Sequence, residues 1–354
     1  MLDRKFNACL MRPEDVSPSD DALEVVGTFN PGALAVDGEV VLLVRVAERP
    51  RERRDAFTAL PRREPGAGLA IDWVANEELT FIDPRVVEIK ATGDIRLTFI
   101  SHILVARSKN GRSIDSVSAT RFFPQEDCET YGVEDPRITR IQGPGLGDEY
   151  HFTYVAVSKH GAGTALASTA DFDRFERHGI VFPPENKDVL LFPERIGGEY
   201  AAFHRPNPAT HFTPPEMWLA YSSDLIHWGR HEPFHGGAGA WESGRIGGGC
   251  PPMRTERGWL EIYHGNERSA TGVGVYSAGA VLLDIENPQR VLGRTDGPIM
   301  VPEADFEREG FVADVVFPTG LVDRGDVLQV YYGAADANVG VVEWAKADLL
   351  AALH

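Results

Sequence analysis

Apolar and polar positions along this chain alternate in short strand-like runs, and one strand-turn-strand unit recurs five times. Each copy joins two apolar runs through a turn, and most copies end on a polar or charged residue. The five copies span residues 30–45, 134–158, 188–205, 250–264 and 316–332. Repeated strand pairs are typical of radial β architecture, in which each unit buries its faces against its neighbours. The pattern therefore predicts an all-β fold, specifically a five-bladed β-propeller.

The spacing of the copies predicts one domain with an insertion. The last four copies begin at intervals of 54, 62 and 66 residues, whereas the first interval is 104 residues long. The long interval has room for an inserted loop region at about 47–120, part of which is rich in Arg, Glu and Pro. Helical periodicity near the chain end predicts a short C-terminal helix within 342–353. We expect a single domain that spans residues 1–354.

The net charge and composition of the chain limit the kinds of molecule that it can bind. The 354 residues carry a formal net charge of -18, which argues against nucleic acid and anionic membrane as partners, because basic surfaces bind both. A neutral substrate fits this charge better. No apolar run approaches the length of a membrane span, and the first ten residues lack the apolar core of a signal peptide, so we expect a cytoplasmic protein. The sequence predicts no oligomeric state.

The cysteines indicate neither a disulfide framework nor a metal site. Cys9, Cys128 and Cys250 are few and lack the spacing of metal ligands, so we interpret them as buried or idle thiols. The candidate polar residues are likewise too mixed in type to form a compact ligand set. We therefore expect no metal and no cofactor.

Position within the repeat predicts which polar side chains meet. In a propeller, the inner strand ends of all blades converge on one axial funnel, so residues far apart in sequence become neighbours there. The candidates lie at the start of a copy, at the end of its second strand, or close to one. They are Asn30, Asp135, Asp188, Arg205, Arg245, His264 and Asp336.

Asp135 is the candidate acid of this pocket. It precedes Pro136, which disfavours the helical region for the preceding residue and predicts an extended Asp135. A turn hydrogen bond is the alternative role for an Asp-Pro pair. Arg45 and Arg205 each end a largely apolar strand, where a guanidinium presents a fork of donors to hydroxyls, carboxylates or phosphate. The alternative for each arginine is an ion pair between blades.

Taken together, the motifs resemble glycoside hydrolase family 130. The resemblance is ordered and runs from Asn30 to Asp336. The residues that carry it are Asn30, Arg45 and Tyr276 together with the segments 132–137, 186–188, 191–194, 204–206, 241–247, 251–252, 263–265, 280–284, 314–318 and 332–336.

The resemblance implies a five-bladed β-propeller that cleaves β-mannosides with inversion, by phosphorolysis or by hydrolysis. Asp135 is similar to the family's general acid, which in some descriptions acts through a hydroxyl of the mannosyl ring. Asn30, Arg45 and Asp336 match positions that hold the mannosyl unit, and Asn186 and Asp188 complete the candidate substrate-binding set. The residues that match positions on the phosphate or nucleophile side are Arg205, Arg245, His264 and Tyr276, with Asn186 also near the phosphate.

One departure from the family pattern favours hydrolysis. Where the family's phosphorylases resemble Arg-Asn-Lys-Asp, this chain has Glu185 before Asn186. An anion there repels phosphate and supplies a candidate base for water. We therefore expect an inverting exo-acting β-mannosidase for β-1,2-linked mannosides, with Asp135 as acid and Glu185 as base. The alternatives are an inverting β-mannoside phosphorylase, which uses inorganic phosphate and releases mannose 1-phosphate, and a non-catalytic carbohydrate-binding propeller. Subsites beyond the mannosyl ring are expected from loops at 46–71 and 99–123.

Overall fold

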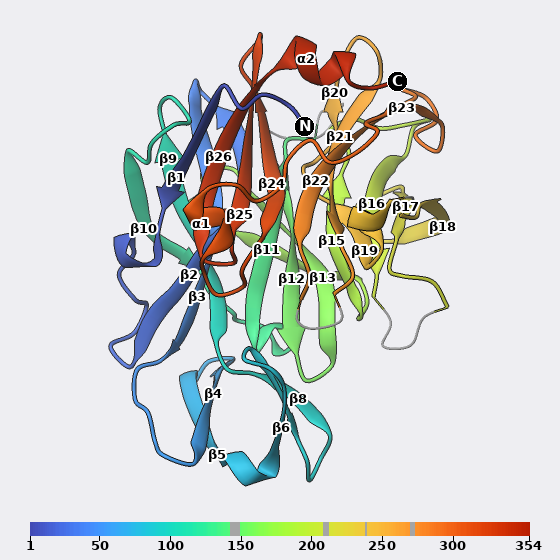
Figure 1. Ribbon diagram of the computed structural model, residues 1–354. Helices are drawn as coiled ribbons and strands as arrows, with labels where there is room; N and C mark the ends of the chain where they lie inside the picture. Colours follow the sequence, from blue (N-terminus) through green and yellow to red (C-terminus); the bar gives the residue numbers. More distant parts are fainter. Residues whose placement is uncertain (142–148, 208–211, 238, 270–272) are drawn as a thin grey trace.

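The protein is built from antiparallel β-sheets, as the computed structural model shows for residues 1–141, 149–207, 212–237, 239–269 and 273–354 (Figure 1). Five sheets make up the main body. The first contains β2 (Leu23–Val36), β3 (Glu39–Pro50), β9 (Ile100–Ser108) and β10 (Ser116–Phe122). The second contains β11 (Gly132–Thr139), β12 (Tyr150–Ser158), β13 (Gly161–Thr169) and β14 (Glu176–Phe182). The third contains β15 (Asn186–Leu191), β16 (Tyr200–Pro206), β17 (Met217–Ser222) and β18 (Trp228–His235).

The two remaining sheets of the main body come from the C-terminal part of the chain. The fourth has the order β19 (Arg245–Gly248), β21 (Trp259–Asn266), β22 (Tyr276–Leu283) and β23 (Val291–Arg294), with β20 (Met253–Arg254) paired to β21. The fifth contains β24 (Val316–Asp323), β25 (Val327–Ala334), β26 (Asn338–Ala345) and the N-terminal strand β1 (Phe6–Met11). The all-β prediction is confirmed, and the five predicted strand pairs lie in five different sheets.

The prediction for the first strand of the fourth copy is wrong. The sequence pattern starts this copy at Cys250, but the strand that leads the fourth sheet is β19, which ends at Gly248. Its four residues include Gly247 and Gly248, which lack the apolar side chains that mark the other leading strands. The strand that comes directly after Cys250 is β20, which has only two residues.

Apolar clusters fill the spaces between successive sheets. One cluster packs Leu43 of the first sheet against Phe152 of the second, and another packs Leu166 of the second against Ala202 of the third. The pairs Phe203 with Val281, Leu282 with Val330, and Val341 with Leu42 represent the clusters between the third and fourth, fourth and fifth, and fifth and first sheets. Each sheet thus buries both faces, and this burial of apolar area is the main favourable term for the fold.

The first strands of the sheets lie beside one another. Strand β2 contacts both β24 and β11, β11 contacts β15, and β15 contacts β19, while β22 of the fourth sheet contacts β24. Polar residues on these strands therefore come together although they are far apart in sequence.

The two ends of the chain meet in the fifth sheet. Strand β1 pairs antiparallel with β26, and Phe6 lies opposite Glu343. The chain then ends in the helix α2 (Lys346–Ala351), which is shorter than the helical pattern at 342–353, because residues up to Ala345 are held in β26 by pairing with β25. The other helical segments are η1 (Pro13–Asp15), η2 (Asn76–Glu78), η3 (Asp127–Glu129), η4 (Ala240–Glu242) and α1 (Asp305–Arg308). In the described part of the chain, no helix has the length and apolar character needed to cross a membrane.

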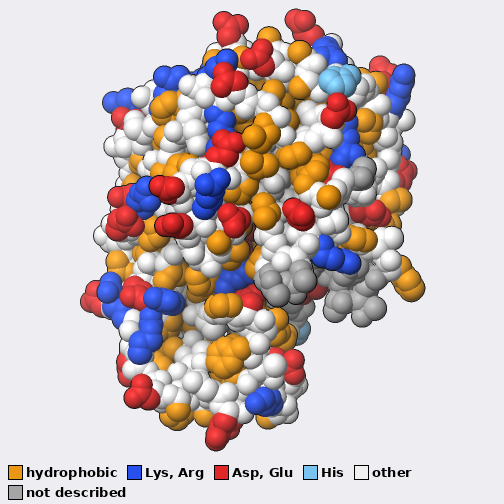
Figure 2. All heavy atoms as spheres, viewed as in Figure 1, with side chains coloured by type: hydrophobic (Ala, Val, Ile, Leu, Met, Phe, Trp, Pro, Cys, Tyr) orange, Lys and Arg blue, Asp and Glu red, His pale blue; other side chains and the backbone are white. Residues whose placement is uncertain are grey.

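The inserted strands form a small unit at the lower end of Figure 1. It contains the pair β4 (Phe57–Glu64) and β5 (Gly68–Ala75) and the three-stranded sheet of β6 (Leu79–Asp83), β7 (Val86–Ile89) and β8 (Asp94–Leu97). Leu60, Leu79 and Val87 make its buried core. The insertion is narrower than the expected 47–120, because β3 runs to Pro50 and β9 and β10 complete the first sheet. Acidic and basic side chains are interspersed on the face shown in Figure 2.

Candidate active site

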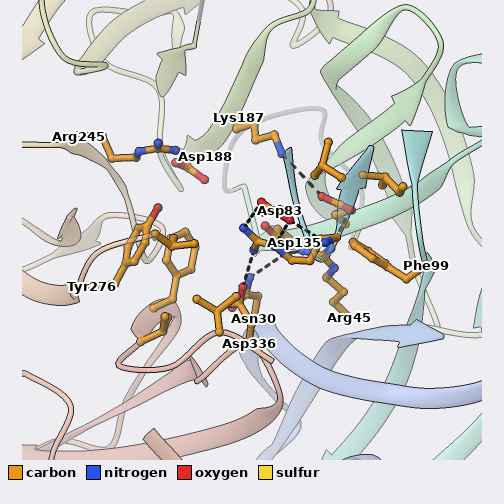
Figure 3. A pocket seen from close by; sticks show the side chains of 18 of the residues that line it. Asn30, Arg45, Asp83, Phe99, Asp135, Lys187, Asp188, Arg245, Tyr276 and Asp336 are labelled. Atoms are coloured by element: carbon orange, nitrogen blue, oxygen red, sulfur yellow. Dashed lines mark hydrogen bonds and ion pairs between the residues drawn. The ribbon is translucent and has the colours of Figure 1, made fainter. Parts of the chain in front are cut away.

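A polar pocket of about 440 Å³ lies where the first strands of the five sheets meet (Figure 3). Each of these strands contributes a side chain to its wall. The residues are Asn30 from β2, Asp135 from β11, Asp188 from β15, Arg245 from β19 and Phe317 from β24. The residues predicted from repeat position that line this pocket are Asn30, Asp135, Asp188, Arg205, Arg245 and Asp336.

Three of these side chains enter the pocket from equivalent β-bulges. The strand register shifts between Phe29 and Gly32 in β2, around Asp135 in β11, and around Asp188 in β15. Asn30, Asp135 and Asp188 have φ values of 49°, 49° and 55°. Asn and Asp tolerate this left-handed region better than other residues with a Cβ, and a bulge re-aims the side chain of its strand. The expectation of an extended Asp135 is therefore wrong, because the bulge overrides the preference set by Pro136.

Asp135 is held by two donors on one carboxylate oxygen. Asn30 Nδ2 donates to Asp135 Oδ1 at 2.8 Å, and Arg45 Nη1 donates to the same oxygen at 2.9 Å. Burial opposes the ionisation of Asp135, but the charges of Arg45 and Arg137 and the bond from Asn30 together hold its pKa below the ordinary value. In the free protein Asp135 is thus a carboxylate, and the second oxygen is left for a ligand as far as the described residues show.

Arg45 connects the first sheet to the second. Its Nη2 donates to Glu134 Oε1 at 2.7 Å and its Nε to Ser101 Oγ at 3.1 Å, while its guanidinium lies over the Phe29 ring at 4.6 Å. Arg45 also lines the pocket. Both interpretations of this arginine therefore hold: it forms ion pairs between sheets and also presents its guanidinium to the pocket.

Asp336, which follows β25, has the opposite electrostatic environment to Asp135. Burial raises the pKa of Asp336 to about 6, although the charges of Arg85 and Arg45 oppose the shift. Arg85 Nη1 donates to Asp336 Oδ2 at 3.1 Å. The pocket thus holds two carboxyl groups whose pKa values are displaced in opposite directions.

Cationic groups gather around Asp188 at the other end of the pocket. Arg205 Nε donates to Asp188 Oδ2 at 2.7 Å, and Arg137 Nη2 lies 3.7 Å from Asp188 Oδ1. Burial opposes ionisation of Asp188, but Arg205 and its neighbours hold the pKa of this carboxyl well below the ordinary range. Arg245 also lines this end, and its buried Nε has no hydrogen-bond partner among the described residues.

Tyr276 completes this end as a neutral donor. Burial raises the pKa of its hydroxyl, so Tyr276 stays protonated at neutral pH. In Figure 3, Arg245, Asp188 and Tyr276 lie on one side, and Asp83, Asp135, Arg45 and Phe99 lie on the other. One end of the pocket, called the cationic end below, thus holds Arg245 and the Asp188 carboxylate with its arginine partners. The other end holds the carboxyl groups of Asp83 and Asp135 together with Arg45.

Three predicted site residues lie outside the lining of this pocket. His264 is fully buried, its ring packs on Phe317 with centroids 4.2 Å apart, and burial lowers its pKa to about 3, so it is neutral rather than cationic. Asn186 is buried and forms a hydrogen bond with His204 Nδ1 at 3.0 Å. Glu185 is exposed and accepts a hydrogen bond from the backbone N–H of Ala162 at 2.9 Å, so its carboxylate is engaged elsewhere.

The structure adds residues that the sequence did not single out as site residues. Glu134 and Lys187 line the pocket directly before the bulges at Asp135 and Asp188, and Lys187 Nζ lies 3.8 Å from Glu134 Oε2. Glu134 and Lys187 directly precede the candidates Asp135 and Asp188 in the sequence, and this adjacency could have identified them. The insertion contributes Asp83, Arg85, Val86, Leu97 and Phe99, for which no repeat existed to give a signal.

The donor set suits a sugar and an anion. Within the residues described, no group of three or more His, Cys, Asp or Glu side chains is arranged to hold a metal ion. Cys250 is buried, and burial raises the pKa of its thiol well above the ordinary value, while Cys9 and Cys128 are partly buried free thiols. Amide, carboxyl and guanidinium groups in one recess can bind hydroxyls at one end and a phosphate at the other.

The sequence relatives of this chain include proteins that are named mannoside phosphorylases. The chain is 41% identical to a β-1,2-mannobiose phosphorylase from Listeria innocua over 96% of this chain and 95% of that protein. It is 37% identical to a 1,2-β-oligomannan phosphorylase from Thermoanaerobacter over 69% of this chain and 78% of that protein. The crystal structure of the Listeria innocua β-1,2-mannobiose phosphorylase with β-1,2-mannobiose matches with a TM-score of 0.89 at 40% identity, over 97% of this chain and 96% of that chain.

These relatives contradict the expectation of a β-mannosidase. The hydrolase interpretation rested on Glu185 as a base in place of a phosphate-binding cation. The similar proteins are named phosphorylases, and Glu185 points to the backbone of Ala162 rather than into the pocket. The substitution at this position therefore does not identify a hydrolase.

A family model described as β-1,4-mannooligosaccharide phosphorylase matches residues 73–354. This match covers most of the chain and includes Asp135, Asp188, Arg205, Arg245 and Asp336. The chain is an enzyme that acts on β-mannosides, and it belongs to glycoside hydrolase family 130.

Proposed function

We propose that this protein is an inverting β-mannoside phosphorylase that cleaves β-1,2-linked mannobiose or short β-1,2-mannooligosaccharides with inorganic phosphate. The products are mannose 1-phosphate and the shortened saccharide. The observation that carries the proposal is the cationic end of the pocket, where Arg245 and Tyr276 lie on the side away from Asp135 (Figure 3). Arg205, which donates to Asp188, also lines the pocket. The identity with the Listeria innocua β-1,2-mannobiose phosphorylase supports the choice of linkage.

We assign the residues at one end of the pocket to the mannosyl unit and those at the other end to phosphate. Asn30, Arg45 and Asp336 bind the mannosyl hydroxyls, because amide, guanidinium and carboxyl groups pair well with hydroxyls. Arg205 and Arg245 bind phosphate, and Tyr276 donates its hydroxyl. Asp188 fixes Arg205 through the 2.7 Å bond and so orients the anion site. Inversion then follows from attack on the face of the sugar opposite to the leaving oxygen.

The proton balance needs no base. A phosphate oxygen forms the new bond to the anomeric carbon, the bond from that carbon to the glycosidic oxygen breaks, and the leaving oxygen takes up one proton. Hydrogen phosphate loses one proton as it becomes the sugar phosphate ester, so the overall reaction is balanced. Because Asp135 is a carboxylate in the free protein, it must first gain a proton in the complex. It then delivers that proton to the leaving oxygen, either directly or by giving it to a mannosyl hydroxyl that passes its own proton to the leaving oxygen.

We also propose that the five sheets form a five-bladed β-propeller and that residues 1–354 make a single catalytic domain. The five apolar clusters between successive sheets, including the one between the fifth and the first, support this arrangement. The pairing of β1 with β26 supports it as well, because a strand from the N-terminus then completes the last blade.

The proposed function is tested by comparing which glycosidic linkage the enzyme cleaves in the presence of phosphate. The purified protein is incubated with phosphate and either β-1,2-mannobiose or β-1,4-mannobiose, and the release of mannose 1-phosphate is measured. We expect release from the β-1,2-linked sugar to be faster by about tenfold or more, the size of a modest specificity difference. Release only from the β-1,4-linked sugar would contradict the linkage, and no mannose 1-phosphate from either would contradict phosphorolysis.

A further inference from the structure

We infer that the turn between β6 and β7, which carries Asp83 and Arg85, forms the subsite for the leaving saccharide and selects it. This inference rests on the proposed phosphorolysis and deepens it. Both residues come from the insertion and line the same pocket as Asp135. The five sheets provide the chemistry, and the inserted unit provides recognition of the leaving group.

The turn is fixed in place rather than free. Asp83 lies opposite Val86 in the pairing of β6 and β7, so Pro84 and Arg85 make the connection. Thr98 anchors this connection, since its backbone N–H donates to Arg85 O at 3.0 Å and its Oγ1 donates to Pro84 O at 2.9 Å. Thr98 directly precedes Phe99, which lines the pocket. The segment that leads from β8 into β9 therefore determines where the turn presents its side chains.

The guanidinium of Arg85 is oriented before a ligand arrives. Asp83 Oδ2 accepts from Arg85 Nη2 at 3.1 Å, and Asp83 Oδ1 accepts from the Arg85 backbone N–H at 2.7 Å. Arg85 Nη1 reaches across to Asp336 Oδ2 at 3.1 Å. The Arg85 and Asp83 side chains are still 24% and 28% exposed, so both keep polar atoms that a sugar hydroxyl can reach. A preoriented ion pair costs little ordering when a ligand binds.

The side of the pocket on which the turn lies assigns its role. In an inverting displacement, the nucleophile and the leaving group occupy opposite faces of the anomeric carbon. If phosphate binds at the end with Arg245 and Tyr276, then the leaving saccharide departs at the other end. Asp83 lies at that other end, beside Asp135 (Figure 3). The acid must also lie on the leaving-group side, and Asp135 meets this requirement.

Apolar side chains from the same insertion complete the subsite. Val86, Leu97 and Phe99 line the pocket next to the ion pair. Pyranose rings present C–H groups on their faces and hydroxyls at their edges, so a wall with apolar side chains beside an ion pair suits a sugar. The expected loops at 46–71 and 99–123 include only Phe99 of these residues, and the rest of the subsite lies between them.

The test uses the reverse reaction, in which mannose 1-phosphate donates to an acceptor sugar that fills this subsite. For Arg85→Ala we expect the KM for acceptor mannose to rise by about tenfold or more, and the preference for mannose over glucose to fall, because one charged donor is lost. The KM for phosphate in the forward reaction is expected to change less than about threefold. Asp83→Asn, which keeps the side-chain size, serves as a second variant and is expected to raise the acceptor KM as well.

The matched control is Arg54→Ala, which removes an exposed arginine of the same insertion whose guanidinium lies over Trp73 and not in the pocket. Its acceptor KM should equal that of the parent. An unchanged acceptor KM and acceptor preference in both Arg85→Ala and Asp83→Asn, with phosphorolysis intact, would overturn the subsite assignment alone. A parent protein that makes no mannose 1-phosphate would overturn the proposed function and the inference with it.

Discussion

Asn30 and Asp135 occupy equivalent bulges in neighbouring sheets, and the amide of Asn30 donates to Asp135 Oδ1 at 2.8 Å. Both residues have a φ of 49°, which turns each side chain out of its strand and into the pocket. The repeat thus places an amide from one sheet against the carboxylate of the next, and Arg45 adds a charged donor to the same oxygen.

The first prediction concerns Asp135→Asn. The amide cannot accept and deliver a proton, so phosphorolysis of β-1,2-mannobiose should fall by about 10²–10⁴-fold, the usual value of general acid catalysis. The fold should persist, because an amide can still accept bonds from Asn30 and Arg45. The measurement is kcat for mannose 1-phosphate release, with circular dichroism as the control for folding. Activity within a few-fold of the parent would exclude Asp135 as the acid.

The second prediction concerns the cationic end. Arg245→Ala should raise the KM for phosphate by about 10–100-fold, because a charge-assisted hydrogen bond is worth about 1.5–3 kcal/mol. The KM for mannobiose should change much less, since Arg245 lies away from Asn30 and Asp135 in Figure 3. Arg290→Ala, at an arginine on the surface, is the control. Equal increases in both KM values would argue against a dedicated phosphate site.

The third prediction concerns Glu185→Gln. The Glu185 carboxylate accepts from the Ala162 N–H and lies outside the pocket lining, and a glutamine oxygen can accept the same bond. We therefore expect phosphorolysis within about twofold of the parent, as is usual for an exposed substitution remote from the chemistry. A loss of more than tenfold would show that Glu185 acts in turnover after all.

The fourth prediction is a pH-dependent change in stability. The pKa of Asp336 is raised in the folded protein to about 6, so its contribution to folding is present at low pH and is lost as the pH rises through 6. At pH 8 the buried charge is a cost that Asp336→Asn removes. The Tm of this variant relative to the parent should therefore be higher at pH 8 than at pH 5, by on the order of 2 °C.

Thermal unfolding of Asp336→Asn, the parent and the control Asp55→Asn at both pH values measures this effect. Asp55 is exposed, so its substitution should shift Tm equally at the two pH values. The same relative Tm for Asp336→Asn at pH 5 and pH 8 would contradict the raised pKa.

The sequence predicted the strand pairs and much of the pocket for one physical reason. A repeated unit puts equivalent positions at equivalent places, so Asn30, Asp135 and Asp188 were expected to converge before any geometry was known. The bulges that aim them were not predicted, because a left-handed φ leaves little trace in sequence beyond the Asn or Asp itself.

The features that the sequence did not predict belong to elements that occur only once or depend on the direction of a side chain. Strand β1 has no counterpart in the repeat, so its pairing with β26 was missed. Asp83 and Arg85 lie in an insertion that occurs once, so position gave no clue to their place in the pocket. Glu185 shares a segment with Asp188 but turns away, and the motif carried no information about that direction.

The central claim is that phosphate, not water, attacks the mannoside. The most direct measurement follows β-1,2-mannobiose by ¹H and ³¹P NMR with the unmodified protein, in phosphate and in a phosphate-free buffer. We predict equal amounts of mannose and α-mannose 1-phosphate in phosphate, and no more than about a hundredth of that cleavage without it. Release of mannose alone, at the same rate in both buffers, would contradict the account.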